Sequence, residues 1–268
     1  MDFAASQFLL DLYANVDVFL VVFVRVMGFF IILPVMVGQN IPIFARIGLS
    51  LGLALLAFTS NIIVLPPYEF TLLGFGFLIL QEFMIGLVIG FAVMMYFSLF
   101  HFVGQLVDFQ MGFAMVSVAD PLGQQQQTPI TGNFYYLIIS VFFVWTGALH
   151  AVIEAFFHSF GMIPMGEAHV LGNPVLAFFM FEVIVEYFVF ALRIALPVIG
   201  TIIIVDIILG ILVKAVPQMN VFVVGLPIKV FLGLIVIYLT LPMLQSAFGF
   251  VMNDLISTIW NLIGGMMP

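Results

Sequence analysis

Six long apolar runs occupy most of this sequence and limit what it can fold into. Each is close to, or longer than, the roughly 20 residues that a helix needs to cross the hydrocarbon core of a bilayer. The runs are Val16–Leu33, Ile43–Leu65, Phe70–Phe102, Phe134–Phe157, Val175–Val213 and Leu226–Phe248. Only 7% of the residues are charged, against roughly 25% in soluble domains, so a soluble chain could not cover these runs. The sequence predicts an all-α integral membrane protein with about six apolar helical segments.

Two of the runs are too long for one perpendicular span. Pro197 removes a backbone donor inside Val175–Val213, which predicts a kink there. Gly86 and Gly90 are expected to relax the helix over Phe70–Phe102. A short amphipathic tail is expected over Val251–Ile263. We expect residues 1–268 to form a single membrane-embedded helical domain, with some segments kinked or split into hairpins and one long central loop over about 104–132.

Charge and motif content exclude several classes of function. The net charge is −8 and the five basic residues form no patch, which disfavours nucleic acid and anionic lipid surfaces as partners. Cysteine is absent, so disulfides and thiolate metal sites are excluded. The sequence has no G-x-S-x-G, H-E-x-x-H, P-loop or dinucleotide-binding motif. Asp206 is the one aspartate deep in a run, whereas an intramembrane aspartyl protease would need two. The sequence predicts no enzymatic activity and no cofactor.

Several charged side chains lie inside the apolar runs, where charges are costly and normally paired. They are Arg25, Glu82, Glu182, Glu186, Arg193 and Asp206. Arg25 and Glu82 are each expected to find a buried partner. Glu182, Glu186 and Arg193 share about one face of a helix by the 3.6-residue repeat. Two interpretations stay open for these three: ion-paired contacts between helices or subunits, or a proton or ion relay.

His150, Glu154 and His158 also share a helix face, as a metal site would require. On a straight helix, however, His150 and His158 are roughly 12 Å apart, which is too far to share one ion. One helix then offers two ligands at best. The sequence predicts no metal site here.

The central connection, about 104–132, is long for a membrane protein of this size. Connections of this length are usually functional or disordered. Aromatic residues and methionines alternate with glycine in its first half, and four glutamines between two prolines follow. The candidate functional residues are Phe109, Met111, Gly112, Phe113, Met115, Asp120, Pro121, Gln124, Gln125, Gln126, Gln127 and Pro129. A solvated linker has little use for the apolar members, so the composition indicates a loop that packs into a partner or a pore.

The segment GQLVDFQMGFAMVSVADPLGQQQQTPITGNFYYL, Gly104 to Leu137, resembles the signature of the FliR family of flagellar type III export proteins. RVMGFFIILPVMVGQNIPIFARIGLSLGLAL, Arg25 to Leu55, is similar to the first hairpin of that family. VPQMNVFVVGLPIKVFLGLIVIYLTLP, Val216 to Pro242, is similar to its late loop and following helix. The three stretches fall in order across nearly the whole chain. The family includes the SctT-type component of the injectisome, but the stretches Gly104–Leu137 and Val216–Pro242 look nearer the flagellar branch.

This resemblance implies a non-enzymatic export gate in the bacterial inner membrane, within the flagellar basal body. Members of the family assemble with FliP- and FliQ-type subunits, near FlhB- and FlhA-type components, into a closed cone that conducts unfolded flagellar proteins. The family's central loop plugs the inner opening. In such a plug, apolar side chains would seal by packing and dewetting. Glycines and prolines would keep the loop bent, and glutamines would offer hydrogen bonds without charge.

Two other functions remain as alternatives. The central loop could instead be a subunit-docking loop, because long loops serve either role. The whole chain could be a stand-alone secondary transporter or ion channel, which predicts inverted repeats and paired broken helices. Pro197 breaks one run, but the first half of the chain has no matching break.

Overall fold

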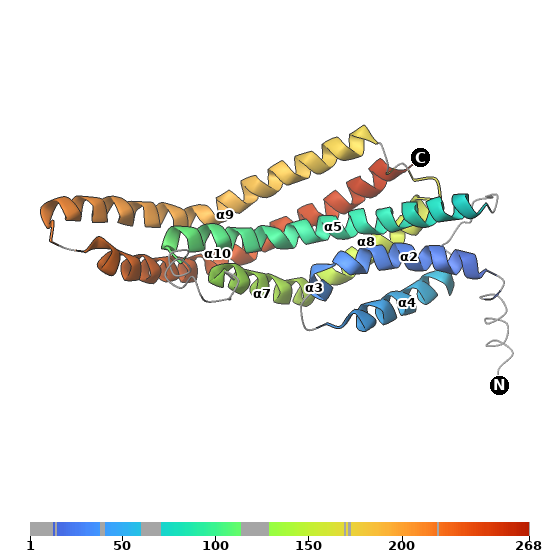
Figure 1. Ribbon diagram of the computed structural model, residues 1–268, viewed down its shortest axis with the longest axis horizontal. Coiled ribbons are helices and arrows are strands. Elements are labelled where there is room, and N and C mark those ends of the chain that lie inside the picture. Colours follow the sequence, from blue (N-terminus) through green and yellow to red (C-terminus); the bar gives the residue numbers. More distant parts are fainter. Residues whose placement is uncertain are drawn as a thin grey trace. The chain divides into compact units, whose positions relative to one another are not determined.

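The computed structural model describes residues 13, 15–37, 41–59, 71–113, 129–168, 170, 173–218 and 220–267. Every regular element within these ranges is a helix, so the predicted all-α class is confirmed (Figure 1). The helices are α2 (Val16–Ile32), α3 (Pro34–Val37), α4 (Ile43–Thr59), α5 (Leu72–Met111), α7 (Ile130–Trp145), α8 (Ala148–Met162), α9 (Pro174–Ala215) and α10 (Val221–Met266).

Three helices of the described chain, α5, α9 and α10, are long and apolar enough to cross a membrane. The number rises to four if α7 and α8 together form one broken span. Helix α4 is also apolar but is shorter, with 17 residues. The membrane-embedded character predicted from the apolar runs is therefore confirmed, and the number of six segments is approximate. An apolar run can equally become a short helix that packs on its own chain.

The largest differences between the helix boundaries and the sequence prediction are at three places. Helix α5 continues to Met111, well into the expected central loop. Helix α10 continues to Met266 and includes the expected separate tail. The fourth apolar run is broken between Trp145 and Ala148. The signal for this break is the Thr-Gly pair at 146–147, where Gly147 has a φ of 77°.

The chain forms two compact units. Unit 1 takes its residues from 1–94, 147–183 and 254–268, and unit 2 from 95–146 and 184–253. Helices α5, α9 and α10 each contribute residues to both units.

In unit 1, α2 packs alongside α4, and aromatic rings fill the core. Phe29 on α2 stacks on Phe156 of α8, with ring centroids 4.4 Å apart. Helix α9 starts at an Asn-Pro pair: the Asn173 side chain accepts a hydrogen bond from the Leu176 N–H at 3.3 Å, and proline suits the first helical position. The Asn173 amide also donates to the Gly265 carbonyl at 3.0 Å, which attaches the start of α9 to the end of α10.

Helices α2 and α5 approach so closely in unit 1 that their backbones touch at glycines. A Cβ added to Gly86 would meet the backbone at Arg25 and Phe29, and one added to Gly90 would lie 2.8 Å from the Phe29 carbonyl oxygen. On the facing helix, a Cβ on Gly28 would lie 2.5 Å from the Phe83 carbonyl oxygen. Gly86 and Gly90 have the spacing of small residues that let membrane helices pack closely. They serve this packing in addition to any effect on helix flexibility.

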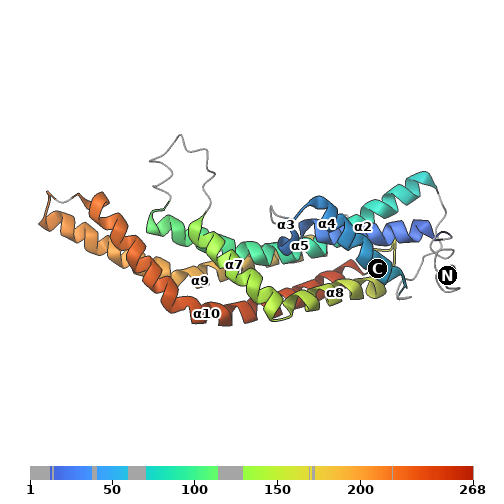
Figure 2. The ribbon, with the colours of Figure 1, turned by 90° about the horizontal axis from the view of Figure 1, so that it is seen from below.

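In unit 2, aromatic side chains join α5, α7 and α10. Phe97 on α5 meets Phe143 on α7 edge-to-face, with centroids 4.8 Å apart. Phe142 on α7 stacks against Phe248 on α10 at 5.6 Å. Such pairs add to the burial of apolar area. The packing brings the C-terminal end of α5 beside the N-terminal end of α7, as Figures 1 and 2 show.

Candidate functional site

The two described ends of the central loop form one structure in unit 2, which we call the neck. It consists of residues 104–113 at the end of α5 and residues 129–132 at the start of α7. Three kinds of contact hold it together: the cap that ends α5, a carboxylate at the start of α7, and a glycine-to-glycine crossing.

Helix α5 ends in a glycine cap. The Gly112 N–H donates to the Phe109 carbonyl at 3.2 Å, and the Phe113 N–H donates to the Asp108 carbonyl at 3.0 Å. Gly112 has a φ of 87°, the left-handed conformation that glycine adopts most readily. These two bonds are the pattern that commonly closes a helix C-terminus. The chain therefore leaves α5 at a defined point and in a defined direction.

The Asp108 side chain joins α5 to α7. Its two carboxylate oxygens accept hydrogen bonds from the Thr131 N–H at 3.2 and 3.0 Å. Asp108 is only 6% exposed. Thr131 lies in the first turn of α7, where backbone N–H groups have no partner within the helix and the helix dipole favours negative charge. Pro129, which precedes the helix, has no side-chain acceptor for them, so Asp108 caps α7 from another helix.

Two glycines allow this contact. A Cβ added to Gly104 would run into the backbone of Gly132, and a Cβ added to Gly132 would lie 2.9 Å from the His101 carbonyl oxygen. Gly104 is one helical turn before Asp108 and on the same face of α5. The backbone crossing at Gly104 therefore places Asp108 against the first turn of α7.

The other side of the neck packs on α10. Met111, the last residue of α5, is completely buried. A Cβ added to Gly233 of α10 would meet the Met111 sulfur at 2.7 Å. Gly112 lies near the Leu226 side chain. The end of α5 is thus held by two neighbouring helices.

Replacing Gly112 with alanine is expected to destabilise the end of α5 by about 1–2 kcal/mol, because an L-residue is strained in the left-handed region. Thermal unfolding followed by the fluorescence of Trp145, which lies in unit 2, measures this in a Trp260→Phe background. Gly210→Ala in α9 is the matched control, because a Cβ there meets nothing within 4 Å. Equal stability of the two variants would contradict the cap.

The structure places the predicted loop residues in three different settings. Phe109 is 71% exposed on the last turn of α5, whereas Met111 is completely buried. Gly112 and Phe113 form the helix cap, and Pro129 directly precedes α7. The remaining candidates lie outside the described residues: Met115, Asp120, Pro121, Gln124, Gln125, Gln126 and Gln127.

The predicted start of the loop at about residue 104 is wrong. Residues 104–111 are helical because Val103, Val107 and Met111 recur every four residues and are all completely buried. Gly104 and the polar residues of this stretch look like loop residues in the sequence, but they serve the crossing with α7. Phe109 and Met111 therefore belong to a helix, and Met111 packs on α10.

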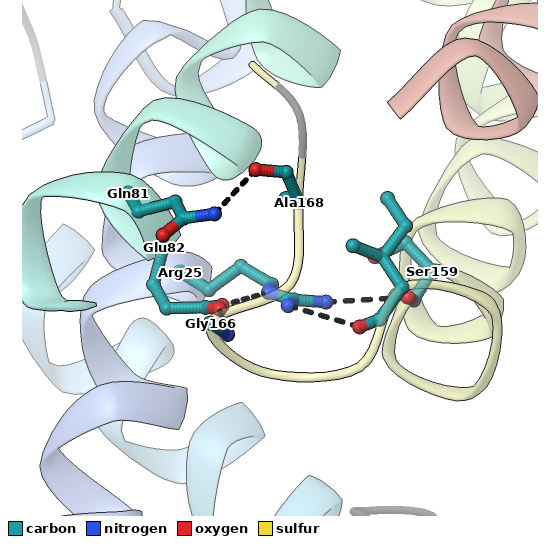
Figure 3. Close-up of polar contacts among 7 residues, drawn as sticks. Arg25, Gln81, Glu82, Ser159, Gly166 and Ala168 are labelled. Atoms are coloured by element: carbon teal, nitrogen blue, oxygen red, sulfur yellow. Dashed lines mark hydrogen bonds and ion pairs between the residues drawn. The ribbon is translucent and has the colours of Figure 1, made fainter. Parts of the chain in front are cut away.

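In unit 1, Arg25 and Glu82 are completely buried and form an ion pair, with Arg25 Nε 2.5 Å from Glu82 Oε2 (Figure 3). The Arg25 guanidinium also donates to the Ser159 carbonyl at 3.2 Å and to the Ile163 carbonyl at 3.3 Å, at the C-terminal end of α8. The other Glu82 oxygen accepts the Gly166 N–H at 3.1 Å. Helix C-terminal carbonyls favour a cation, so the arginine is neutralised by both partners.

A second contact from α5 supports the same turn. The Gln81 side-chain amide donates to the Ala168 carbonyl (Figure 3). The Arg25 guanidinium also lies over the Phe160 ring, 4.5 Å from its centroid, an attractive cation–π arrangement. Together these contacts hold the segment after α8 on α2 and α5. The network therefore joins α2, α5 and the end of α8 within unit 1.

The other charges of the apolar runs are not buried in the described chain, and the pairing of Glu182, Glu186 and Arg193 between helices or subunits stays a prediction. Glu182, Glu186 and Arg193 are all exposed. Helix α9 presents much of its surface outward, including large apolar side chains. Arg193 lies over its own helix neighbour Phe190, at the edge of a hollow of about 320 Å³ between α9 and α10. The position of these charged residues in an apolar run therefore did not mean that their side chains are buried within this chain.

Asp206 on α9 pairs with Lys229 on α10 in unit 2. The Asp206 side chain is 45% exposed and that of Lys229 is 23% exposed, so Asp206 is paired but is not buried. The pair joins two neighbouring helices of this unit.

His150, Glu154 and His158 lie on α8. His158 lies 3.9 Å from Glu154, and both side chains are largely exposed. Among the residues that the structure describes, no group of three His, Asp or Glu side chains could hold a metal ion.

Sequence reasoning missed the roles of Asp108, Gly104 and Gly132. Asp108 and Thr131 are 23 residues apart, and no local pattern pairs them. The available signal was the four-residue spacing of Gly104 and Asp108 on one helix face, which becomes visible only if the helix is extended to Met111.

Comparisons with known proteins now decide the family. The family model described as bacterial export proteins, family 1, matches residues 16–255. The chain belongs to this family. This export-family chain is 32% identical over 251 residues to the flagellar biosynthetic protein FliR of Bacillus subtilis (strain 168), which covers 91% of the chain and 94% of the relative. It is 30% identical over 210 residues to the Yop proteins translocation protein T of Yersinia pestis, covering 76% and 78%.

A third relative, the flagellar biosynthetic protein FliR of Aquifex aeolicus (strain VF5), is 29% identical over 221 residues, covering 82% of the chain and 83% of the relative. The resemblance to the FliR family seen in the sequence is confirmed. Membership of an export family with apolar, membrane-crossing helices makes the chain a type III export component. The family assignment replaces the alternative of a stand-alone transporter or ion channel.

Proposed function

We propose that this export-family chain is a non-enzymatic subunit of the flagellar type III export gate. It assembles with FliP- and FliQ-type subunits, beside FlhB- and FlhA-type components, into a closed pore in the bacterial inner membrane. Unfolded flagellar proteins pass through this pore, and the central loop between α5 and α7 acts as its plug. The names of the relatives and the match across residues 16–255 support the assignment.

The geometry of the neck is the observation that carries the plug. The chain leaves α5 at Gly112 and enters α7 at Ile130, and the Asp108–Thr131 contact keeps these two points together. A segment that starts and ends at one point can occupy an opening without displacing the helices around it. A loop that only connects two spans would not need a contact that holds the end of α5 against the start of α7.

The composition of the loop agrees with this role. Between Gly112 and Pro129 the sequence holds apolar residues, four consecutive glutamines and a single charge, Asp120. Apolar side chains can close a pore by dewetting, and uncharged amides form hydrogen bonds without an electrostatic trap for a passing polypeptide. Non-helical backbone at membrane depth is tolerated where it lines a cavity or packs on protein.

The exposed surface of α9 suits other membrane subunits. Arg193 is exposed beside an apolar hollow lined by Pro197, Met243 and Phe250. An exposed charge on an apolar helix is costly unless a partner neutralises it. A neighbouring helix with an acidic residue would fill the hollow and pair with Arg193, so assembly supplies what the isolated chain lacks.

Shortening the loop tests the plug. Removing Asp120–Thr128 in the native cell leaves Pro129 and the whole neck in place, and the remaining residues bridge two helix ends that the Asp108–Thr131 contact holds near each other. The measurements are swimming, leakage of small ions or dyes, and recovery of the assembled complex. We expect an intact complex that leaks or no longer supports swimming.

Two results would contradict the plug. Normal swimming with a tight membrane would make the loop a spacer. Loss of the complex itself would make it a subunit-docking loop. A variant with Gln124–Gln127 replaced by four serines is the matched control, because it keeps the length and the neutral polar character of the stretch and should remain tight.

A further inference from the structure

The Asp108 carboxylate links the two helices of the neck. It belongs to α5, and it accepts the Thr131 N–H of α7 through both oxygens, at 3.2 and 3.0 Å. Because a capping residue normally precedes its own helix, a cap supplied by another helix ties two elements together. Removing this side chain frees the start of α7 without removing any part of the loop.

The surroundings of Asp108 make this tie rigid. The Gly104–Gly132 crossing brings the two backbones into contact one turn away, and Met111 is buried on α10 at Gly233. Hydrogen bonds to a charged group are stronger than neutral ones, and a buried position reduces competition from water. The bond therefore lies in a closely packed setting that water does not readily enter.

We propose that Asp108 is a positioning residue of the gate, which keeps the neck closed both when the pore is shut and during export. The end of α5 and the start of α7 then stay side by side throughout export. Joining the ends of a loop costs conformational entropy. In this chain that entropy is already lost when the neck folds. This proposal rests on the plug function above, but its first test does not depend on it.

The first test is hydrogen exchange at the start of α7 in the purified, assembled complex. Asp108→Ala removes the acceptor of the Thr131 N–H, so exchange there should become about tenfold to a hundredfold faster, the ratio that corresponds to one hydrogen bond to a charged group. Gln105→Ala is the matched control, because Gln105 is exposed on the same helix. Unchanged exchange in Asp108→Ala would overturn the proposal, whatever the loop does.

The second test replaces the hydrogen bond with a bond that can be switched. The chain has no cysteine, so Asp108→Cys with Thr131→Cys introduces a single pair. Diamide takes up the two protons and two electrons of the thiols as the disulfide forms, and a reducing agent reverses the reaction. The oxidised complex should be tight and should still export. The reduced complex should leak, as should Asp108→Ala.

The outcomes separate the proposal from the plug function. An oxidised complex that is tight but does not export would show that the neck must open, which overturns the proposal. A reduced complex or an Asp108→Ala complex as tight as the wild type would also overturn it. If instead the complex lacking Asp120–Thr128 is tight, the plug function fails, while hydrogen exchange still reports on Asp108.

Discussion

Arg25→Ala is expected to destabilise unit 1 by about 3–5 kcal/mol, the usual cost of leaving the other member of a buried ion pair uncompensated. The variant leaves the Glu82 carboxylate buried without its cation. It also removes the donors of the Ser159 and Ile163 carbonyls at the end of α8. Unfolding can be followed through Trp260, which lies against His158 of α8, in a Trp145→Phe background.

Two further variants identify the cause of that loss. Arg25→Lys keeps the positive charge but has no planar fork to reach three acceptors, so its stability should be intermediate. Arg25→Leu combined with Glu82→Leu should cost less than the sum of the single variants, because the two residues belong to one network. Wild-type stability of Arg25→Ala, or strict additivity in the double variant, would contradict the network.

Gly86→Ala should also destabilise unit 1, near or above the upper end of the roughly 1–3 kcal/mol that overpacking costs. The added methyl group would meet the backbone of α2 at Arg25 and Phe29, and backbone cannot move aside as a flexible side chain can. The helices would have to separate, which also stretches the Arg25–Glu82 contact. The measurement is again thermal unfolding followed through Trp260.

Gly76→Ala on the same helix is the control for this effect. A Cβ at Gly76 meets nothing within 4 Å, and alanine is the better helix former by about 1 kcal/mol. The two variants should therefore shift the melting temperature in opposite directions. Shifts of the same sign and size would show that helix propensity, and not close packing, decides the outcome at Gly86.

The sequence predicted the helical class because continuous apolar runs of about 20 residues have the length of membrane-spanning helices. It also indicated that Arg25 and Glu82 need partners. It could not show that they pair with each other, because 57 residues separate them and only the packing of α2 on α5 brings them together.

The boundaries of the central loop show where local reasoning failed. Gly104 and Asp108 were interpreted as loop residues, although Val103, Val107 and Met111 continue the helical spacing. Glycine and aspartate are common in loops, so they suggested a loop here. In the structure they serve tertiary contacts: Gly104 lies at a helix crossing, and Asp108 caps another helix. The glycine that does end the helix is Gly112, with its positive φ.

The charges on α9 show a different limit. An apolar run predicts a surface that avoids water, but lipid, another helix of the chain or another subunit can each cover it. Glu182 and Arg193 are exposed in this chain. Their exposure in one chain therefore does not identify what neutralises them.

The most direct measurement of the central claim is electrical conductance across a planar bilayer that contains the purified, assembled export complex. The complex with the wild-type chain should be silent, and the complex with a chain lacking Asp120–Thr128 should conduct ions in discrete steps. The same silence from both complexes, with all subunits present, would contradict the claim that the central loop closes the pore.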